Sequence, residues 1–194
     1  MNMSVVDTSM LATEHIRPLR RHEYEQLARD GAFDDERVEL LFGVIVEMSP
    51  PDPSHDESIY WVGEHLRKQL GELAVVRIQS TFAASDISEP QPDVLVVPPG
   101  SYWTAHPERA YLAVEVSKSS LRKDRVVKAK LYGGADVEEY WIVDVVAGEV
   151  EVCRDPLDGE WRSRTTYRRG QRIAMARFPE VVVAVDEVVP PVAS

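Results

Sequence analysis

The chain has 194 residues, a hydrophobic content of 44% and a formal net charge of −11. This length favours one domain with one sizeable core, and no run approaches the roughly 18 apolar residues of a membrane helix. The N-terminus has no basic segment followed by an apolar one, so we expect a cytoplasmic protein without membrane contact. Cys153 is the only cysteine, which excludes an internal disulfide and a cysteine-rich zinc site. Any bound metal must therefore have oxygen ligands.

The acidic balance argues against general affinity for nucleic acid, because phosphates are normally met by Lys and Arg. Basic residues nevertheless gather in three stretches, 17–21, 122–130 and 162–172. These stretches are compatible with a local basic lining for a polyanion, and also with ordinary solvated surfaces.

The N-terminal third contains one predicted hairpin and two predicted helices. After a flexible segment over residues 1–18, we expect a short helix over 21–30 and two strands over 38–48 that turn near Gly43. A capping-box pattern from Ser54 to Glu57 predicts a long helix with Ser54 as its N-cap. Its predicted core-facing stripe recurs at steps of three and four residues and consists of Ile59, Val62, Leu66, Leu70 and Leu73.

The rest of the chain alternates strands and helices. Short β-rich runs over 75–82, 93–97 and 111–116 are predicted to be central strands. A second helix over 120–132 should end at Gly133 and Gly134 in a left-handed cap. Residues 139–145 and 149–154 predict a hairpin, which 161–167 continues.

The order of elements predicts an α/β fold with a central mixed β-sheet flanked by helices. One domain should span residues 19–189, followed by a flexible tail over 190–194. No internal repeat or Gly/Ser-rich linker indicates a domain boundary.

Glu115 interrupts an apolar strand, where an unpaired buried charge would cost several kcal/mol. Alternation of side chains puts Glu115 on the face of Ala113 and Ser117. Because those neighbours are small, we expect a cleft with room for a ligand. The alternatives are a buried salt bridge and an edge position exposed to water.

Asp93 follows Pro92 and opens the apolar run that predicts the next strand. If its strand pairs with that of Glu115, the two carboxylates could share a divalent cation. Mg²⁺ prefers such a site, with a few carboxylates, a backbone carbonyl and several waters. The alternative for Asp93 is an ordinary turn acid.

Lys128 falls in the sheet-facing arc of its predicted helix, which also contains Asp124. Most other basic residues of the helix, including Lys123, lie outside this arc. An inward Lys can stabilise charge that develops on a phosphoryl group or orient the attacking water. The alternative is a plain ion pair between Asp124 and Lys128 at i,i+4.

Several weak motifs occur in a fixed order and together carry a resemblance. The first half runs from Val38-Glu39-Leu40 through Glu47-Met48-Ser49-Pro50 and His55 to Glu89-Pro90-Gln91-Pro92-Asp93. The second half runs from Glu115-Val116 through Ser119-Ser120, Asp124, Lys128 and Tyr132 to Glu139-Tyr140-Trp141-Ile142-Val143-Asp144. Over residues 37–154 the chain resembles the Uma-two family of restriction endonucleases, within the PD-(D/E)XK nuclease superfamily.

The resemblance implies a restriction-endonuclease-like core and a set of site residues. Asp93, Glu115 and the backbone carbonyl of Val116 would be the metal ligands, and Glu39 a further acidic site residue. The superfamily usually places its catalytic lysine two residues after the second acid, where this chain has Ser117. Lys128 on the following helix would take that role, and Lys118, predicted to face the opposite way, is the second choice.

The implied activity is Mg²⁺-dependent hydrolysis of phosphodiester bonds in nucleic acid, most simply double-stranded DNA, with Mn²⁺ as a possible substitute. Many nucleases of this type dimerise to reach both strands, so a homodimer is expected. His55 could assist the reaction or only cap a helix. The rival hypothesis is an inactive member of the fold that binds nucleic acid or protein, which Ser117 and the acidic charge favour.

Overall fold

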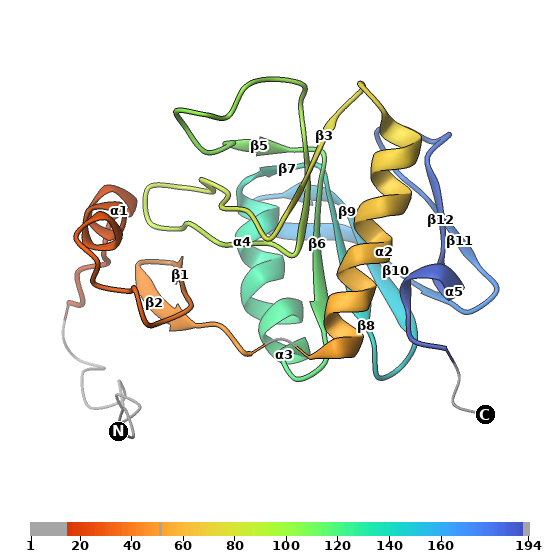
Figure 1. The fold of residues 1–194 in the computed structure, drawn as a ribbon, viewed down its shortest axis with the longest axis horizontal. Helices are drawn as coiled ribbons and strands as arrows, with labels where there is room; N and C mark the ends of the chain where they lie inside the picture. The colour runs from red at the N-terminus through yellow and green to blue at the C-terminus, as the bar shows by residue number, and fades with distance from the viewer. Residues whose placement is uncertain (1–14, 51, 192–194) are drawn as a thin grey trace.

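The computed structural model describes residues 15–50 and 52–191. Most of the predicted flexible N-terminal segment and the last three residues of the predicted tail therefore lie outside the described residues. The helical elements are α1 (Arg21–Arg29), α2 (Pro53–Leu70), α3 (Leu121–Lys123), the π-helical turn η2 (Asp124–Lys128), α4 (Ala129–Gly134) and α5 (Val185–Val188). Figure 1 shows a sheet with α2 and α5 on one side and α4 on the other.

The predicted strands are all present, together with four short strands that were not predicted. The predicted ones are β1 (Val38–Leu41), β2 (Val44–Glu47), β3 (Val75–Ile78), β4 (Val94–Val97), β6 (Leu112–Ser117), β8 (Glu139–Asp144), β9 (Glu149–Leu157) and β10 (Glu160–Arg168). The additional ones are β5 (Arg109–Ala110), β7 (Asp136–Val137), β11 (Arg172–Ala174) and β12 (Val182–Ala184). Six of them form the central sheet in the order β10-β9-β8-β6-β4-β3. Within this six-stranded sheet only the β6–β8 pair is parallel, so the predicted mixed sheet is confirmed.

The strands differ in burial according to their place in the sheet. Every residue of β4, β6 and β8 is buried, as their nearly continuous apolar sequences predict. β3 is an edge strand with half-buried residues, so its prediction as a central strand was wrong. It ends at Ile78, because Gln79 has a positive φ of 43° that turns the chain out of the extended conformation.

Helix α2 begins and ends differently from its prediction. Asp52, and not Ser54, is the N-cap, and its side chain accepts a hydrogen bond from the Ser54 amide at 3.0 Å. Pro53 takes the first helical position, where a missing N–H costs nothing. The helix ends at Leu70, so Leu73 falls beyond it and is 51% exposed instead of joining the buried stripe.

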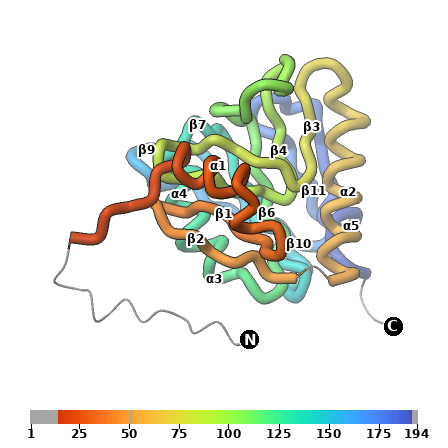
Figure 2. Tube along the Cα trace, turned by 60° about the vertical axis from the view of Figure 1, so that its left-hand side comes forward, coloured from red at the N-terminus to blue at the C-terminus, as the bar shows by residue number. Residues whose placement is uncertain are grey.

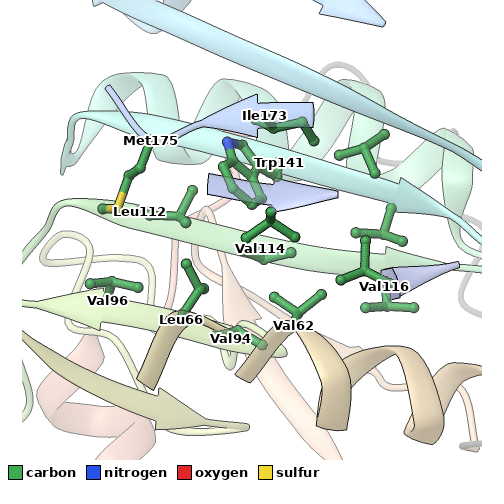
Figure 3. Packing of buried hydrophobic residues seen from close by; sticks show 14 of the residues in the cluster. Val62, Leu66, Val94, Val96, Leu112, Val114, Val116, Trp141, Ile173 and Met175 are labelled. Carbon is green, nitrogen blue, oxygen red and sulfur yellow. The ribbon is translucent and has the colours of Figure 1, made fainter. Parts of the chain in front are cut away.

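One core fills the space between the sheet and the α2 side. Figure 3 shows Val62 and Leu66 of α2 packed toward Val94 of β4 and Val114 of β6. The other cluster lies on the opposite face and includes Ala113. Because side chains alternate along β6, Glu115 shares the face of Ala113, as predicted.

The second predicted helix is a segment interrupted by η2, in which the backbone hydrogen bonds widen to a π-helical turn. The predicted left-handed glycine cap was wrong, since Gly133 and Gly134 lie inside α4 and neither has a positive φ. Gly133 is needed for another reason. A Cβ there would lie 3.1 Å from the backbone of Gly159 and 3.2 Å from Trp161 Nε1, so the small residue permits close packing of α4 on the β9–β10 hairpin.

The hairpin β1–β2 lies with α1 on the side of the molecule away from α2 and α5 (Figure 2). Its turn has positive φ at Phe42 and at Gly43, as two-residue hairpin loops require. Backbone hydrogen bonds in both directions join Leu40 to Glu89 and so tie β1 to the segment that precedes β4. Of the helices in the described ranges, none is both long and apolar enough to cross a membrane.

Candidate active site

Glu115 lies in the middle of β6 with only 6% of its surface exposed. Its Oε1 accepts hydrogen bonds from Lys128 Nζ at 2.9 Å and from the Tyr132 hydroxyl at 2.7 Å. Burial raises the pKa of Glu115 to about 8, and the nearby carboxylates of Asp93, Asp124 and Glu39 act in the same direction. The predicted buried acid is therefore present, and the alternative of a water-exposed edge position was wrong.

Asp93 stands directly before β4, and the β4–β6 register explains its position. Val94 is opposite Val114, so one further step along the antiparallel pair brings Asp93 beside Glu115. Its Oδ2 accepts a hydrogen bond from the Val116 amide at 2.8 Å. Because the N–H and C=O of a strand residue point to the same side, the Val116 carbonyl is directed toward Asp93 as well.

Lys128 links Glu115 of β6 to Glu39 of the β1–β2 hairpin. Its Nζ lies 2.5 Å from Glu39 Oε2 and 2.9 Å from Glu115 Oε1, and the residue is 1% exposed. Desolvation alone would lower the pKa of Lys128, but the carboxylates of Glu115 and Glu39 raise it above its usual value. A charged ammonium thus links β1, β6 and η2 within the core.

The segment formed by α3 and η2 brings further side chains to the site. Lys123, predicted to lie outside the sheet-facing arc, donates to Glu39 Oε1 at 3.1 Å. Asp124 accepts hydrogen bonds from Ser117 Oγ at 2.6 Å and from Ser120 Oγ at 2.5 Å. The alternative ion pair between Asp124 and Lys128 is not found in the described part of the chain, since Lys128 pairs with Glu39 and Glu115 instead.

All five predicted site residues line one small cavity of about 50 Å³: Glu39, Asp93, Glu115, Val116 and Lys128. Asp93 comes from the start of β4, Glu115 from β6, Lys128 from η2 and Glu39 from β1, so four separate segments converge. A water molecule occupies about 30 Å³ in the liquid, so this space suits one or two small ligands.

His55, from the first turn of α2, also lines the cavity. Its Nε2 lies 3.4 Å from Asp93 Oδ2, so its side chain faces the site. The hydrogen bond to Asp93 raises the pKa of His55 to about 9. Lys118, the second choice for the catalytic lysine, pairs with Asp52 at 3.0 Å and is half exposed.

The oxygen atoms at the cavity fit a hard cation that keeps part of its water shell. Within the described residues, Asp93 Oδ1 and Glu115 Oε2 accept no hydrogen bond, and neither is sealed from solvent. No group of three His, Cys, Asp or Glu side chains in the same ranges is close enough to hold a metal ion. Mg²⁺ needs fewer, because one or two carboxylates and a carbonyl suffice when waters complete the shell.

Sequence reasoning identified part of this cluster and missed other members. Glu39 was found by resemblance, Lys128 by its place on the sheet-facing arc of the helix, and Glu115 as a charge inside an apolar strand. His55 was named as a possible participant, but its contact with Asp93 depends on how α2 packs beside β4. Lys123 was missed, because its contact with Glu39 depends on the distant β1 strand.

Comparison with known proteins supplies the family. Residues 21–186, most of the chain, match the Uma2 family, which is described as "Putative restriction endonuclease". The chain belongs to the Uma2 family. The match covers the hairpin, the central sheet and the residues of the acidic cavity, so the resemblance found in the motifs is confirmed.

The Uma2 fold is also found in a solved structure. A protein from Anabaena variabilis, described as a "putative nuclease belonging to DUF820", has a TM-score of 0.74 with this chain at 14% identity. The similarity covers 88% of this chain and 97% of that chain, and it confirms the nuclease-like α/β fold. Comparison with curated proteins yields no match.

Proposed function

We propose that this Uma2 protein is a Mg²⁺-dependent endonuclease that hydrolyses phosphodiester bonds in double-stranded DNA. The observation that carries the proposal is the convergence of Asp93, Glu115 and Lys128 on one cavity. Two carboxylates and a lysine at one point are the groups that metal-assisted hydrolysis of a phosphodiester requires.

The proposed roles follow from the contacts of each group. Asp93, Glu115 and the Val116 carbonyl would hold the cation, which when bound lowers the pKa of water and stabilises charge on phosphoryl oxygens. Lys128 would orient a nucleophilic water or stabilise the developing negative charge, and a buried ammonium does this better than an exposed one. Glu39 holds the Lys128 amine in position through the 2.5 Å contact.

His55 has a supporting role in this proposal. Its contact with Asp93 supplies positive charge at the first acid, so it can orient that carboxylate before a cation arrives. Mn²⁺ should replace Mg²⁺, because both ions accept carboxylate, carbonyl and water ligands.

The test is cleavage of supercoiled plasmid DNA with Mg²⁺, with Mn²⁺ and with EDTA. We expect nicking with either metal and none with EDTA. Asp93→Ala and Glu115→Gln should each lower the rate by 100-fold or more, because each removes a ligand oxygen from the cation. Glu64→Gln is the matched control, since Glu64 is an exposed acid of α2 paired only with Arg67 in the described residues.

Binding of the metal can be measured without cleavage. Mg²⁺ should raise the melting temperature of the wild-type protein but not that of Asp93→Ala, because a ligand stabilises only the state that binds it. Plasmid nicking that survives in both site variants would refute the proposal. Metal binding without any cleavage would favour the rival function, an inactive nuclease fold that binds nucleic acid or protein.

We further propose a homodimer that acts on both DNA strands in the cytoplasm. Sedimentation of the purified protein should give twice the chain mass of 21.9 kDa. Double-strand breaks that accumulate in one binding event would support paired sites, whereas a monomer that only nicks would contradict this part of the proposal.

A further inference from the structure

A second cavity lies on the α1 side of the molecule, outside the acidic site. It has a volume of about 610 Å³ and is lined by α1, by residues 81 and 89 of the segment before β4, and by residues 102–108 of the β4–β5 loop. Figure 1 shows these three segments near one another at the side away from α2. The volume falls in the range of roughly 300–1,000 Å³ that is typical of small-ligand sites.

Glu89 gives this cavity an unmet hydrogen-bond acceptor. The residue is 7% exposed, and its Oε2 atom is buried without a partner. Folded proteins keep few such atoms, so each one calls for an explanation. Burial raises the pKa of Glu89 to about 7, a hydrogen bond with the Glu25 carboxyl and its charge act in the same direction, and Arg21 opposes them.

A second unpartnered polar atom lies beside the same cavity. In the described ranges the only other buried side-chain nitrogen or oxygen without a partner is Arg77 Nε. The Arg77 guanidinium carbon stands 5.4 Å from the ring centroid of Tyr102, which lines the cavity. Arg77 does not itself line the cavity, and its contact with Tyr102 is what links this donor to the cavity lining.

Aromatic side chains lie at the same place. Trp103 is 94% exposed, which is unusual for the largest apolar side chain. Tyr102 beside it is held by a hydrogen bond from its hydroxyl to the Pro98 carbonyl at 2.8 Å. A fixed ring next to an exposed ring offers a surface on which a flat ligand can stack.

Two arginines of α1 lie among the acidic residues Glu25, Glu89 and Glu108 of the cavity lining. Arg21 also pairs with Glu108 at 3.6 Å, and Arg29 has 61% of its side chain exposed. Both also contact Glu25, at 3.9 Å and 3.8 Å, so they are held near the opening. Guanidinium groups at a rim suit the phosphates of a ligand whose flat part enters the cavity.

We propose that this cavity binds a nucleobase that carries an exocyclic amino group, with Glu89 Oε2 accepting the amino hydrogen and Trp103 stacking on the ring. Glutamate recognises the cytosine amino group in this way, and adenine and guanine also carry one, whereas thymine does not. The choice of a nucleobase over a cationic amine rests on the proposed function and on the two rim arginines.

The cavity lies close enough to the acidic site to act on the same strand. Glu89 and Asp93 are four residues apart, so their Cα atoms are within about 14 Å. Leu40 pairs with Glu89 while its neighbour Glu39 faces the acidic cavity. A base held by Glu89 is therefore a few nucleotides from the cleaved phosphate, and the cavity would give cleavage a base preference.

The test is binding of single nucleotides by the whole protein, measured by calorimetry in EDTA so that no cleavage occurs. The probes are dCMP, dAMP, dGMP and TMP. We expect at least one of the amino-bearing nucleotides to bind 10-fold or more tightly than TMP. Glu89→Leu should reduce the affinity for that nucleotide to the TMP level, and Trp103→Ala should weaken all binding by about 10-fold.

Trp61→Ala is the matched control, since Trp61 is an exposed tryptophan of α2 outside this cavity. If Glu89→Leu does not fold, the proposal is tested with Trp103→Ala, because Trp103 is exposed. The proposal would be overturned if TMP bound as tightly as the amino-bearing nucleotides, or if no nucleotide bound up to about 10 mM. It would also be overturned if Trp103→Ala had the affinity of the wild type, or if the protein bound spermidine in place of nucleotides. A protein that binds nucleotides selectively but never cuts DNA would refute only the nuclease function, and one that cuts without such binding would refute only the cavity.

Discussion

At the scale of single residues, this protein places charges where an ordinary core has apolar atoms. Lys128 offsets two buried carboxylates at once, and without it Glu115 would have no cationic partner in the described residues and Glu39 would keep only Lys123. Burial would raise the pKa of Glu39, but Lys128 and Lys123 hold it below its usual value. Lys128 therefore stabilises the fold as well as serving the proposed chemistry.

Lys128→Met tests the structural role of that lysine. Breaking a buried ion pair by removing one partner should lower the free energy of unfolding by about 3–5 kcal/mol. The two remaining carboxyls would then have raised pKa values in the folded state, so the variant should lose stability as the pH rises from 5 to 8. Urea denaturation at both pH values measures this.

The matched control is Lys130→Met on the exposed side of α4, which should change stability by less than about 0.5 kcal/mol. A Lys128→Met protein that is as stable as the control at pH 8 would contradict the proposed charge balance.

Glu89 has its own pH signature. Its pKa is about 7 in the folded protein, owing first to burial, whereas an unfolded Glu titrates near 4.3. The folded state thus binds the proton more tightly, so this group lowers stability progressively as the pH rises from about 4.3 to about 7. Glu89→Gln should remove that loss and make the protein more stable than wild type at pH 8, by about 1–3 kcal/mol.

Thermal melts of the wild type and Glu89→Gln at pH 5 and pH 8 measure this difference in stability. The two proteins should differ at pH 8 much more than at pH 5. A constant difference across this range would mean that Glu89 does not titrate as described.

At the scale of elements, the starts and turns of helices bring the site together. The first turn of α2 carries His55 toward Asp93, and Lys123 at the end of α3 and Lys128 at the end of η2 both reach Glu39. Single π-helical turns often occur at functional sites, because the wider turn redirects side chains that an α-helix would point elsewhere. Local helix geometry is thus part of the candidate active site.

Substitutions at the start of α2 test whether Asp52 or Ser54 is the N-cap of this helix. Asp52→Ala should lower the free energy of unfolding by about 1 kcal/mol, because Asp52 accepts the Ser54 amide at the helix start. Ser54→Ala should cost less, since the Ser54 hydroxyl only donates to Asp52 Oδ1. Asp52→Asn preserves an acceptor and serves as the control. Chemical denaturation that ranks Ser54→Ala as the worse variant would favour Ser54 as the cap.

At the scale of the whole molecule, a net charge of −11 constrains how the protein could bind the DNA that we propose as its substrate. Near the acidic cavity the positive side chains are Arg37 and Lys123, which line it, and Arg122, which is exposed next to Lys123. Because the acidic surface as a whole repels a polyanion, we expect the phosphates close to the cleaved bond to be contacted by these three residues. We therefore expect weak non-specific binding and a strong requirement for divalent cations.

The salt dependence of DNA binding tests this distribution of charge. Three phosphate contacts give a slope of about −3 for the logarithm of affinity against the logarithm of salt concentration. The measurement uses a short duplex and the Asp93→Ala protein, so that the DNA stays intact. Arg122→Gln should make the slope shallower by about 1, and Arg172→Gln on β11 should not change it. Equal effects of the two variants would place the binding surface elsewhere.

The sequence alone determined the fold class and revealed Glu115 as a buried acid of the site. Apolar runs and their periods predicted α2, β4, β6 and β8, because burial of one face constrains residue types locally. The same rule revealed Glu115, since a charge in an apolar strand stands out, and side-chain alternation assigned its face. The position of Lys128 on the sheet-facing arc of its helix indicated its role, which the family resemblance supported, whereas the role of Glu39 came from the resemblance.

The tertiary structure decided which side chains meet Glu115. Glu39 is 76 positions earlier in the chain, and only the pairing of Leu40 with Glu89 brings its strand to the sheet. The inward turn of Lys123, the approach of His55 to Asp93 and the unmet Glu89 carboxyl depend likewise on packing between distant segments. Periodicity describes one element at a time, whereas these contacts arise from the register between strands and from a shift in helical hydrogen bonding, which no local pattern encodes.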